Sequence, residues 1–291
     1  MEILSTKNFL KNINFQNYSI EDFRKLSNAT SNVFIPDSQT LDMNFQRGIL
    51  LYALIGFEKP NKILEFGTGG GFSTLCMAKA LHDFKIDGKI YTIDRIAHNE
   101  KTERLIQLPD STKPIKTKIS NQEVWNYVCP LDIIKKITPI QGYSGTVMDN
   151  IEFKNIDFCY IDGVHTYDGT KHDFFSFLKN ASDSFSVLFD DYIDREFYGV
   201  KAFVDQELEP NFDIKLIKLD NDNLEDENQD IQKMIYFEYD SKKSPFSDLD
   251  EKSIDTFLQK YRSEDKSTRE RRYNLEKKLP FLKNIKFKFW R

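Results

Sequence analysis

The chain has 291 residues, of which 40% are hydrophobic and 30% are charged. This length fits one α/β domain with extensions, and the composition excludes a disordered protein. With a formal net charge of −5, no nucleic-acid partner is expected, and three widely spaced cysteines exclude a disulfide framework or a zinc cluster. No signal peptide and no apolar run of about 18 residues is visible, so we expect a cytoplasmic protein.

The first part of the chain, residues 1–50, is expected to form an N-terminal helical cap. Apolar residues recur every three or four positions in 20–29 and 40–55, which is typical of helices that bury one face. Pro60 and Asn61 then end the helical pattern.

Residues 51–241 are predicted to form an α/β domain of the Rossmann-like class, in which short apolar strands alternate with helices. Such alternation is typical of a mostly parallel sheet with right-handed crossovers. Seven strands are expected, at 62–67, 87–94, 135–142, 156–163, 185–191, 212–219 and 233–239. Helices are expected to flank the sheet, at 72–84, 167–181 and 198–208.

Three segments lie outside this alternation. Residues 98–130 are longer than a helix and a loop require, and are interpreted as an insertion that closes over a substrate as a lid. The linker 220–230 holds six acidic and no basic residues, so a solvated loop is expected. The C-terminal extension, 242–291, ends in the basic tail 266–291, which has ten basic and two acidic residues. This tail either packs on the domain or contacts a membrane surface or an anionic partner.

A glycine-rich turn joins the first predicted strand of the domain to its helix, with the sequence Leu64-Glu65-Phe66-Gly67-Thr68-Gly69-Gly70-Gly71-Phe72-Ser73-Thr74. Glycines here let the backbone bend tightly and let a ligand approach without a Cβ atom in the way. Phe72 replaces the third glycine of the dinucleotide-binding pattern GxGxxG. The spacing ExGxGxG instead resembles motif I of class I methyltransferases, which use S-adenosylmethionine (SAM). The cofactor-binding residues that this resemblance implies are Glu65, Gly67, Thr68, Gly69, Gly71 and Ser73.

Two further positions are expected to contact the nucleoside of the cofactor. Asp94 closes the second predicted strand of the domain, where a carboxylate can accept hydrogen bonds from both hydroxyls of a ribose. NAD and SAM both require this contact, so Asp94 does not distinguish them. In methyltransferases the turn after the next strand flanks the adenine, which implies a contact with Tyr143 and Ser144.

Acidic residues also follow the next two predicted strands. Asp162 comes directly after one strand, and Asp190 and Asp191 end the other. Because ligands bind beyond the carboxyl ends of parallel strands, these carboxylates are expected to converge on one small volume. Like charges so close need a counter-ion or a proton, and hard oxygen ligands suit Mg²⁺, Mn²⁺ or Ca²⁺.

The pattern IDGxHxY (161–167), followed by the Asp190-Asp191 pair, resembles a branch of class I methyltransferases. This branch includes macrolide-sugar O-methyltransferases and cephalosporin-hydroxylase-like proteins, whose metal site is like that of catechol O-methyltransferase. The resemblance covers about Leu50 to Leu208. It implies that Asp162, Asp190 and Asp191 bind the metal, and that His165 and Asp162 are catalytic. His165 is then a general base, or alternatively a structural residue of a turn that enters a helix.

These features together predict a SAM-dependent O-methyltransferase that uses Mg²⁺ or Mn²⁺ and acts on a hydroxyl of a sugar or a glycosylated molecule. A metal and a base are needed because a sugar hydroxyl is almost fully protonated at neutral pH. Two alternatives stay open: a non-catalytic protein that uses its basic tail, and an NAD-dependent oxidoreductase. A homo-oligomer and a peripheral membrane location are further expectations. His172 is expected on a helix surface, and no pattern supports a role for His82 or His98.

Overall fold

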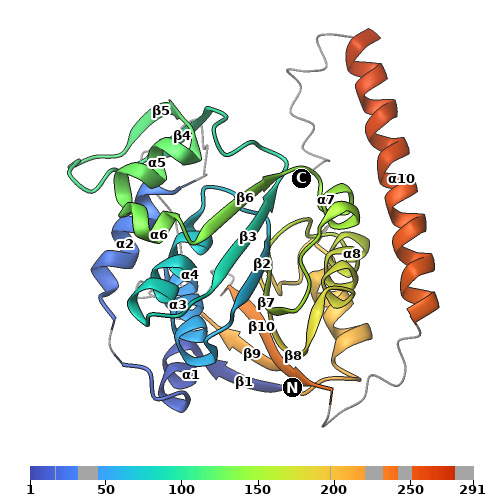
Figure 1. Ribbon diagram of the computed structural model, residues 1–291, viewed down its shortest axis with the longest axis horizontal. Helices are drawn as coiled ribbons and strands as arrows, with labels where there is room; N and C mark the ends of the chain where they lie inside the picture. The colour runs from blue at the N-terminus through green and yellow to red at the C-terminus, as the bar shows by residue number, and fades with distance from the viewer. Residues whose placement is uncertain (17, 32–44, 197, 220–231, 242–250, 279–291) are drawn as a thin grey trace.

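The computed structural model describes residues 1–16, 18–31, 45–196, 198–219, 232–241 and 251–278 (Figure 1). Eight strands form one sheet in the order β1-β9-β10-β8-β7-β2-β3-β6. They are β1 (Glu2–Ser5), β2 (Lys62–Phe66), β3 (Lys89–Asp94), β6 (Ile137–Gln141), β7 (Ile156–Ile161), β8 (Ala181–Phe189), β9 (Lys215–Lys218) and β10 (Lys233–Asp240). Within this described sheet, β10 alone runs antiparallel to its neighbours. The predicted mostly parallel α/β fold is confirmed.

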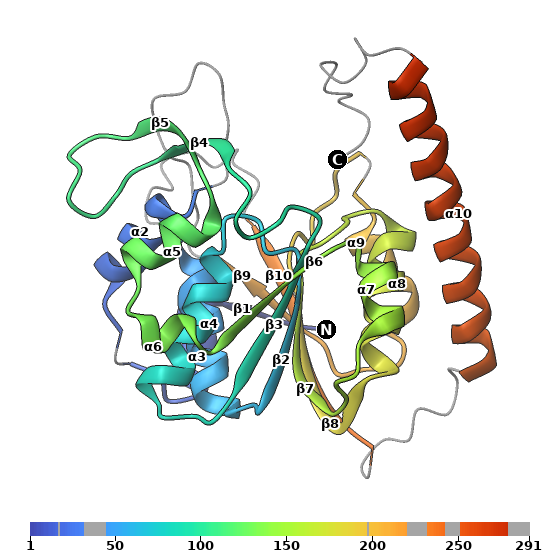
Figure 2. The ribbon, with the colours of Figure 1, turned by 45° about the horizontal axis from the view of Figure 1, so that its top comes forward.

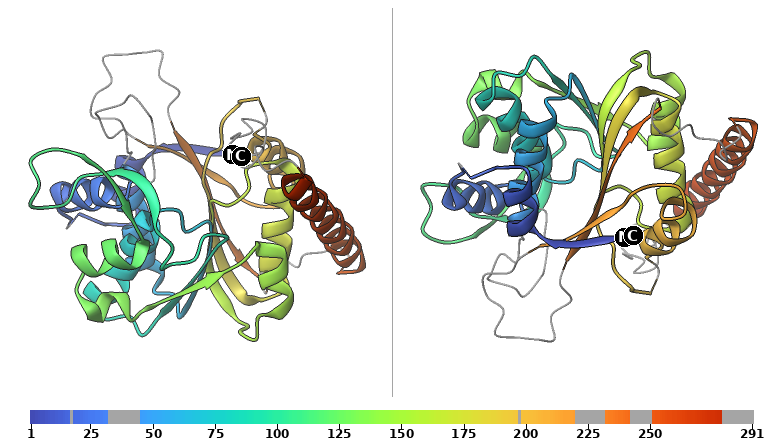
Figure 3. Two further views of the ribbon diagram at one scale, coloured as in Figure 1. Left: turned by 90° about the horizontal axis from the view of Figure 1, so that it is seen from above. Right: turned by 90° about the horizontal axis from the view of Figure 1, so that it is seen from below.

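Helices cover both faces of the sheet (Figure 2). One face carries α1 (Thr6–Asn12), α2 (Ile20–Ala29), α3 (Gln46–Glu58), α4 (Phe72–Asp83), α5 (Asn121–Val128) and α6 (Leu131–Ile134). The other face carries α7 (Ser144–Asn150), α8 (Tyr167–Leu178) and α9 (Val200–Phe203), which a π-helical turn, Val204–Leu208, continues. Helix α10 (Glu251–Lys278) lies outside α8 (Figure 3). No helix among the described residues is long and apolar enough to span a membrane.

The N-terminal segment contributes more than the predicted helices. Residues 2–5 form β1, which pairs in parallel with β9 and adds an eighth strand at the sheet edge. Four residues without clear alternation gave no strand signal in the sequence, and pairing with β9 is what orders them. Helices α1 and α2 bury Phe9, Leu10, Phe23 and Leu26 in the same hydrophobic cluster as α3 and α4.

The predicted insertion begins with a hairpin that the sequence did not indicate. Strands β4 (Thr102–Ile106) and β5 (Ile115–Ile119) pair only with each other. The helix expected in this segment is α5, which begins with a capping box: Ser120 accepts from the amide of Glu123, and the Glu123 carboxylate accepts from the amide of Ser120. Trp125 anchors α5, because its side chain is fully buried.

Helix α10 of the C-terminal extension packs on the α/β domain. Leu258 of α10 is buried, and the Phe257 ring lies 5.6 Å from that of Phe175 on α8. The prediction that His172 lies on a helix surface is wrong, since α10 covers it and only 1% of it is exposed. Tyr261 stacks on its ring at 4.7 Å, and Arg262 Nε donates to His172 Nε2 at 3.1 Å. Residues 220–231 and 279–291, which include the acidic linker and the end of the tail, lie outside the described residues.

A buried carboxyl at the end of α3 should make stability depend on pH. Glu58 accepts hydrogen bonds from Ser186 and from Tyr236, and burial raises its pKa to about 7. A carboxyl whose folded-state pKa is raised stabilises the fold fully below its unfolded-state pKa, near 4.3, and loses that contribution as the pH rises through the folded-state value.

Glu58→Gln should therefore unfold with nearly the same free energy as wild type at pH 4 and be more stable by roughly 2–4 kcal/mol at pH 8. Urea denaturation at both pH values measures this difference, with Glu21→Gln as an exposed control on α2. An equal free-energy difference between Glu58→Gln and wild type at the two pH values would show that Glu58 does not titrate in this range.

Candidate active site

The glycine-rich turn lies at the carboxyl end of β2, against the end of β7. Gly67 has a φ of +92°, and a Cβ atom there would lie 2.0 Å from the carbonyl oxygen of Asp162. The turn and the predicted acidic cluster are therefore in direct backbone contact. Gly71, also at φ +92°, caps α4, and a Cβ atom there would lie 2.3 Å from the Trp125 ring. Both glycines are required for close approach as well as for conformation.

The inserted segment holds the glycine turn from its outer side. Trp125 Nε1 donates to the carbonyl of Gly70 at 3.0 Å, and Asn121 Nδ2 donates to the carbonyl of Gly69 at 2.9 Å. These contacts leave the opposite side of the turn to a ligand. Sequence reasoning missed both residues, because an insertion has no fixed place in an α/β repeat. The structure places α5 against the turn, and the interpretation of residues 98–130 as a lid stays a prediction.

Replacing Gly71 by alanine should abolish cofactor binding or the fold that supports it. The substitution combines a left-handed backbone with a clash against the buried Trp125 ring. A non-glycine residue forced into such a conformation costs about 1–3 kcal/mol before the clash is counted. Gly70→Ala is the matched control, because Gly70 does not have a positive φ. Equal affinity of Gly71→Ala and Gly70→Ala for S-adenosylhomocysteine, measured by calorimetry, would contradict this account.

The remaining residues predicted near the cofactor lie around the turn. Asp94 accepts from the amides of Gly69 and Ile96, both at 2.9 Å, so its carboxylate is fixed beside the turn. Glu65 is fully buried at the end of β2, accepts from Thr74, and has a pKa that burial raises to about 8. Thr68 and Ser73 are also buried, Thr68 against Thr92 and Ser73 in the first turn of α4.

Tyr143 and Ser144 lie at the start of α7, after β6. The Tyr143 side chain is 46% exposed, and Arg269 from α10 lies over its ring at 4.1 Å from the centroid. One face of the ring expected beside the adenine is therefore covered by the C-terminal extension. Sequence reasoning did not connect α10 with this turn, because the two are more than 120 residues apart.

Asp162, His165 and Asp191 form a compact group at the carboxyl ends of β7 and β8. One ligand atom from each lies within 4.8 Å of the others. His165 connects the two acids: its Nε2 is 3.3 Å from Asp162 Oδ1, and its Nδ1 is 3.1 Å from Asp191 Oδ2. Asp191 has a φ of +55°, a left-handed conformation that aspartate tolerates and that turns its side chain away from the direction of β8.

Asp190 has surroundings that differ from the prediction. Its carboxylate is 1% exposed and accepts from four donors: Arg47, the Tyr160 hydroxyl, Gln232 and the amide of Asp191. Arg47, the second residue of α3, also lies 3.5 Å from Asp162 Oδ2. The structure therefore pairs Asp190 with a cation of the chain itself, and His165 takes its place in the three-residue group. No sequence motif marked Arg47, which is 115 residues from Asp162.

Part of the chain is similar to one known protein family. Residues 64–192, from the middle of β2 to the residue after Asp191, match the model of a family described as a methyltransferase domain. A search of curated proteins gave no match.

Solved structures share the fold of this methyltransferase domain. An O-methyltransferase from Bacillus cereus in complex with S-adenosylhomocysteine is 13% identical, with a TM-score of 0.51, over 79% of this chain and 95% of that one. The O-methyltransferase TomG from Streptomyces achromogenes, involved in tomaymycin synthesis and in complex with SAM, is 16% identical, with a TM-score of 0.50, over 80% and 96%. At such identities the likeness concerns the fold. With the matched domain, it confirms the enzyme class predicted from the sequence, a SAM-dependent methyltransferase.

The pKa values of Asp162, Asp190 and Asp191 differ because the nearby positive charge is shared unequally among them. Burial and the neighbouring Asp190 raise the pKa of Asp191 to about 7, and the same two causes raise the pKa of Asp162. Burial would also raise the pKa of Asp190, but Arg47 outweighs it and lowers that pKa. Burial disfavours the charged form of His165, yet the carboxylates of Asp162 and Asp191 raise its pKa. Arg47 thus pairs most closely with Asp190 and more weakly with Asp162, and His165 lies between Asp162 and Asp191.

This donor set fits a divalent cation. Two carboxylates and one imidazole are a mixed oxygen and nitrogen set, which suits Mn²⁺ better than the all-oxygen surroundings preferred by Mg²⁺. Asp162 and Asp191 would supply negative charge, and His165 would bind in its neutral form.

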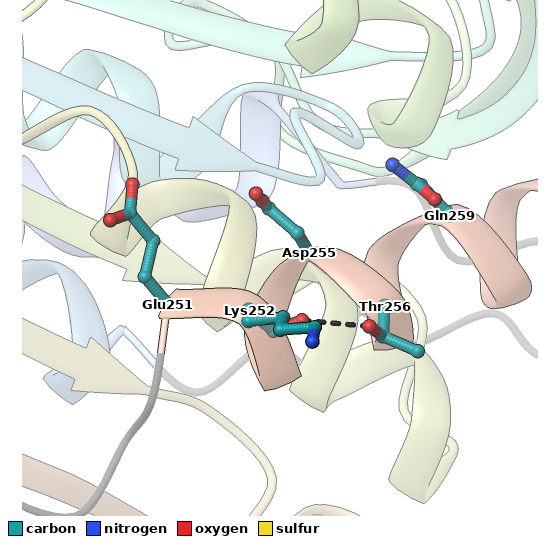
Figure 4. Close-up of a pocket in the computed structure, with 5 residues that line it drawn as sticks. All are labelled: Glu251, Lys252, Asp255, Thr256 and Gln259. Carbon is teal, nitrogen blue, oxygen red and sulfur yellow. Dashed lines mark hydrogen bonds between the residues drawn. The ribbon is translucent and has the colours of Figure 1, made fainter.

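A separate hollow lies along the first turns of α10, in the C-terminal extension (Figure 4). Its lining residues, Glu251, Lys252, Asp255, Thr256 and Gln259, all belong to that helix. None comes from the glycine turn or the acidic group, so this hollow is not the active site.

Proposed function

We propose that the chain is a SAM-dependent O-methyltransferase that acts on a hydroxyl of a sugar or a glycosylated molecule, with a divalent cation held by Asp162, His165 and Asp191. The contact between Gly67 and the backbone of Asp162 carries this proposal, because it brings the cofactor turn and the acidic group to adjoining positions. A methyl group presented at the turn would then face a hydroxyl bound at the acidic group.

The chemistry requires activation of the acceptor rather than of the leaving group. The methyl group moves by in-line displacement from the sulfonium to the hydroxyl oxygen, and the thioether leaves without needing a proton. A divalent cation at this site would lower the pKa of the hydroxyl and fix its direction. Arg47 and Tyr160 contact the Oδ2 atom of Asp162, whereas Oδ1 faces His165 and would be the oxygen available to hold a cation.

His165 has two alternative roles in this proposal. As a ligand, it completes the cation site with the two acids and does not exchange protons. As a general base, it accepts the hydroxyl proton, and Asp162 and Asp191 stabilise the resulting imidazolium. His165→Asn distinguishes them: loss of Mn²⁺ affinity identifies a ligand, whereas unchanged Mn²⁺ affinity with slower transfer identifies a base.

The function is tested by methyl transfer from SAM to a panel of glycosides and free sugars, with Mn²⁺ or Mg²⁺ and with EDTA. The proposal predicts methyl ether formation on a sugar hydroxyl that EDTA abolishes and added Mn²⁺ restores. Transfer at full rate in EDTA would contradict the metal, and transfer only to non-sugar hydroxyls, such as catechols, would contradict the acceptor class.

Contact of the basic tail with a membrane is a separate proposal that rests on the charge of residues 266–291. Co-sedimentation with vesicles containing anionic lipid, for the full chain and for a chain ending at residue 278, tests it. Equal sedimentation of the two chains would assign no membrane role to the segment after α10.

Assembly into a homo-oligomer is likewise a proposal, measured by sedimentation velocity.

A further inference from the structure

The inserted segment contains a buried arginine that its own surroundings do not satisfy. Arg104 lies on β4 and is only 2% exposed. Its Nε donates to Thr102 Oγ1 at 2.8 Å, but its buried Nη1 atom has no hydrogen-bond partner among the described residues. Thr102, Arg104 and Ile106 share one face of the strand, and Ile106 is fully buried in the main core cluster. The guanidinium is thus directed into the molecule rather than toward solvent.

The surroundings of Arg104 place it beside the cofactor turn. Burial lowers the pKa of Arg104, and the negative charge of Asp94 acts in the opposite direction. Asp94 Oδ2 also accepts a hydrogen bond from the amide of Gly69. His98 is a further neighbour of Arg104, and its pKa is lowered by burial and by the charge of Arg104. The His98 ring packs 4.4 Å from the ring of Trp125, the residue that holds Gly70. His98 is therefore joined to the glycine turn through Trp125, and the charge of Arg104 acts on both His98 and Asp94.

Charge at this position does not balance within the described residues. Both carboxylate oxygens of Asp94 already accept backbone hydrogen bonds, and no ion pair joins Asp94 to Arg104 among the described residues. His98 Nδ1 and Asn121 Oδ1 are also buried without a partner. Buried charges in proteins are paired, and an arginine fork matches the oxygens of a carboxylate or a phosphate. The two unpartnered nitrogen atoms, Arg104 Nη1 and His98 Nδ1, can both donate to a missing acceptor group.

We propose that Arg104, with His98 beside it, binds an anionic group, a phosphate or a carboxylate, of a ligand of the active site. Two sources supply this chemistry: the carboxylate of the methionine part of the cofactor, and a phosphate or carboxylate on the acceptor. Which of the two sources supplies the anion depends on the proposed function. The binding of an oxyanion at Arg104 does not depend on it.

The first experiment uses inorganic phosphate as the probe. The melting temperature of the full chain is measured with increasing phosphate against chloride at equal ionic strength, for wild type, Arg104→Gln and Arg104→Lys. Arg95→Gln is the matched control, since it removes the same charge from an exposed residue next to Asp94. Phosphate should stabilise wild type and Arg95→Gln, stabilise Arg104→Lys less, and leave Arg104→Gln unaffected.

The second experiment identifies the source by calorimetry with S-adenosylhomocysteine and 5′-methylthioadenosine, which lacks the amino-acid part. If Arg104 holds the cofactor carboxylate, Arg104→Gln weakens binding of S-adenosylhomocysteine by roughly 10- to 100-fold and leaves methylthioadenosine unchanged. If it holds an acceptor group, both affinities stay unchanged while phosphate stabilisation is lost.

Two results would overturn the proposal. In the first, phosphate raises the melting temperature of wild type and Arg104→Gln equally, and both proteins bind both nucleosides with equal affinity. In the second, Arg104→Gln weakens the binding of both nucleosides equally, which would assign Arg104 to the nucleoside part. Should wild type bind neither nucleoside, the proposed function fails, and the phosphate experiment still decides whether Arg104 binds an oxyanion.

Discussion

Replacing Arg47 by methionine should destabilise the fold by about 3–5 kcal/mol, because it leaves a buried carboxylate without its cation. Asp190 is 1% exposed, and the Arg47 side chain that pairs with it is 18% exposed. Urea denaturation followed by circular dichroism measures the change, provided that the slope of the transition is unchanged.

The double variant Arg47→Met/Asp190→Asn separates the charge from the packing. Removing both charges should restore at least half of the lost stability, since the asparagine can still accept from Tyr160 and Gln232. If Arg47→Met costs less than about 1 kcal/mol, the pair is not a buried ion pair in solution. Asp190 would then be free to bind a cation, as the sequence predicted.

Asp162→Asn should lower metal-dependent transfer by at least about 100-fold, since loss of a direct ligand should cost no less than the 10–100-fold loss typical of an outer-shell partner. The substitution halves the carboxylate charge of the three-residue group and keeps the shape of the side chain. Mn²⁺ affinity measured by calorimetry should fall in parallel, whereas S-adenosylhomocysteine should still bind.

Asp168→Asn is the control for this change, because Asp168 is an exposed acid six residues away, in the first turn of α8. It should retain wild-type transfer and Mn²⁺ affinity. Wild-type Mn²⁺ affinity in Asp162→Asn would remove this residue from the cation site. The proposal would then have to rest on Asp191 and His165 alone.

The sequence could predict the positions of residues that lie near the end of a parallel strand, while their roles stay predictions. Asp94 ends β3, Glu65 is the next-to-last residue of β2, and Asp162 directly follows β7, so the topology alone brings them to one edge of the sheet. The same argument could not separate Asp190 from Asp191, because consecutive residues at a strand end point in opposite directions. The left-handed φ of Asp191 and the ion pair of Asp190 decide their roles, and neither is visible in the sequence.

The residues that the sequence missed come from segments with no fixed place in the α/β repeat. Arg47 reaches the site from a helix before the sheet, and Trp125 and Arg104 reach it from the insertion. His172 was misplaced for a related reason: the face of α8 on which it lies is buried by α10, about 80 residues later in the chain. Long-range packing of this kind leaves no local pattern.

Titration of S-adenosylhomocysteine into the purified chain by calorimetry, with Mn²⁺ or Mg²⁺ present, tests the central claim most directly. A methyltransferase domain with an intact glycine turn and Asp94 predicts saturable binding at one site per chain, lost in Gly71→Ala and retained in Gly70→Ala. Absence of binding to a folded wild-type chain would contradict the assignment of this turn to the cofactor and favour a non-catalytic role for the fold.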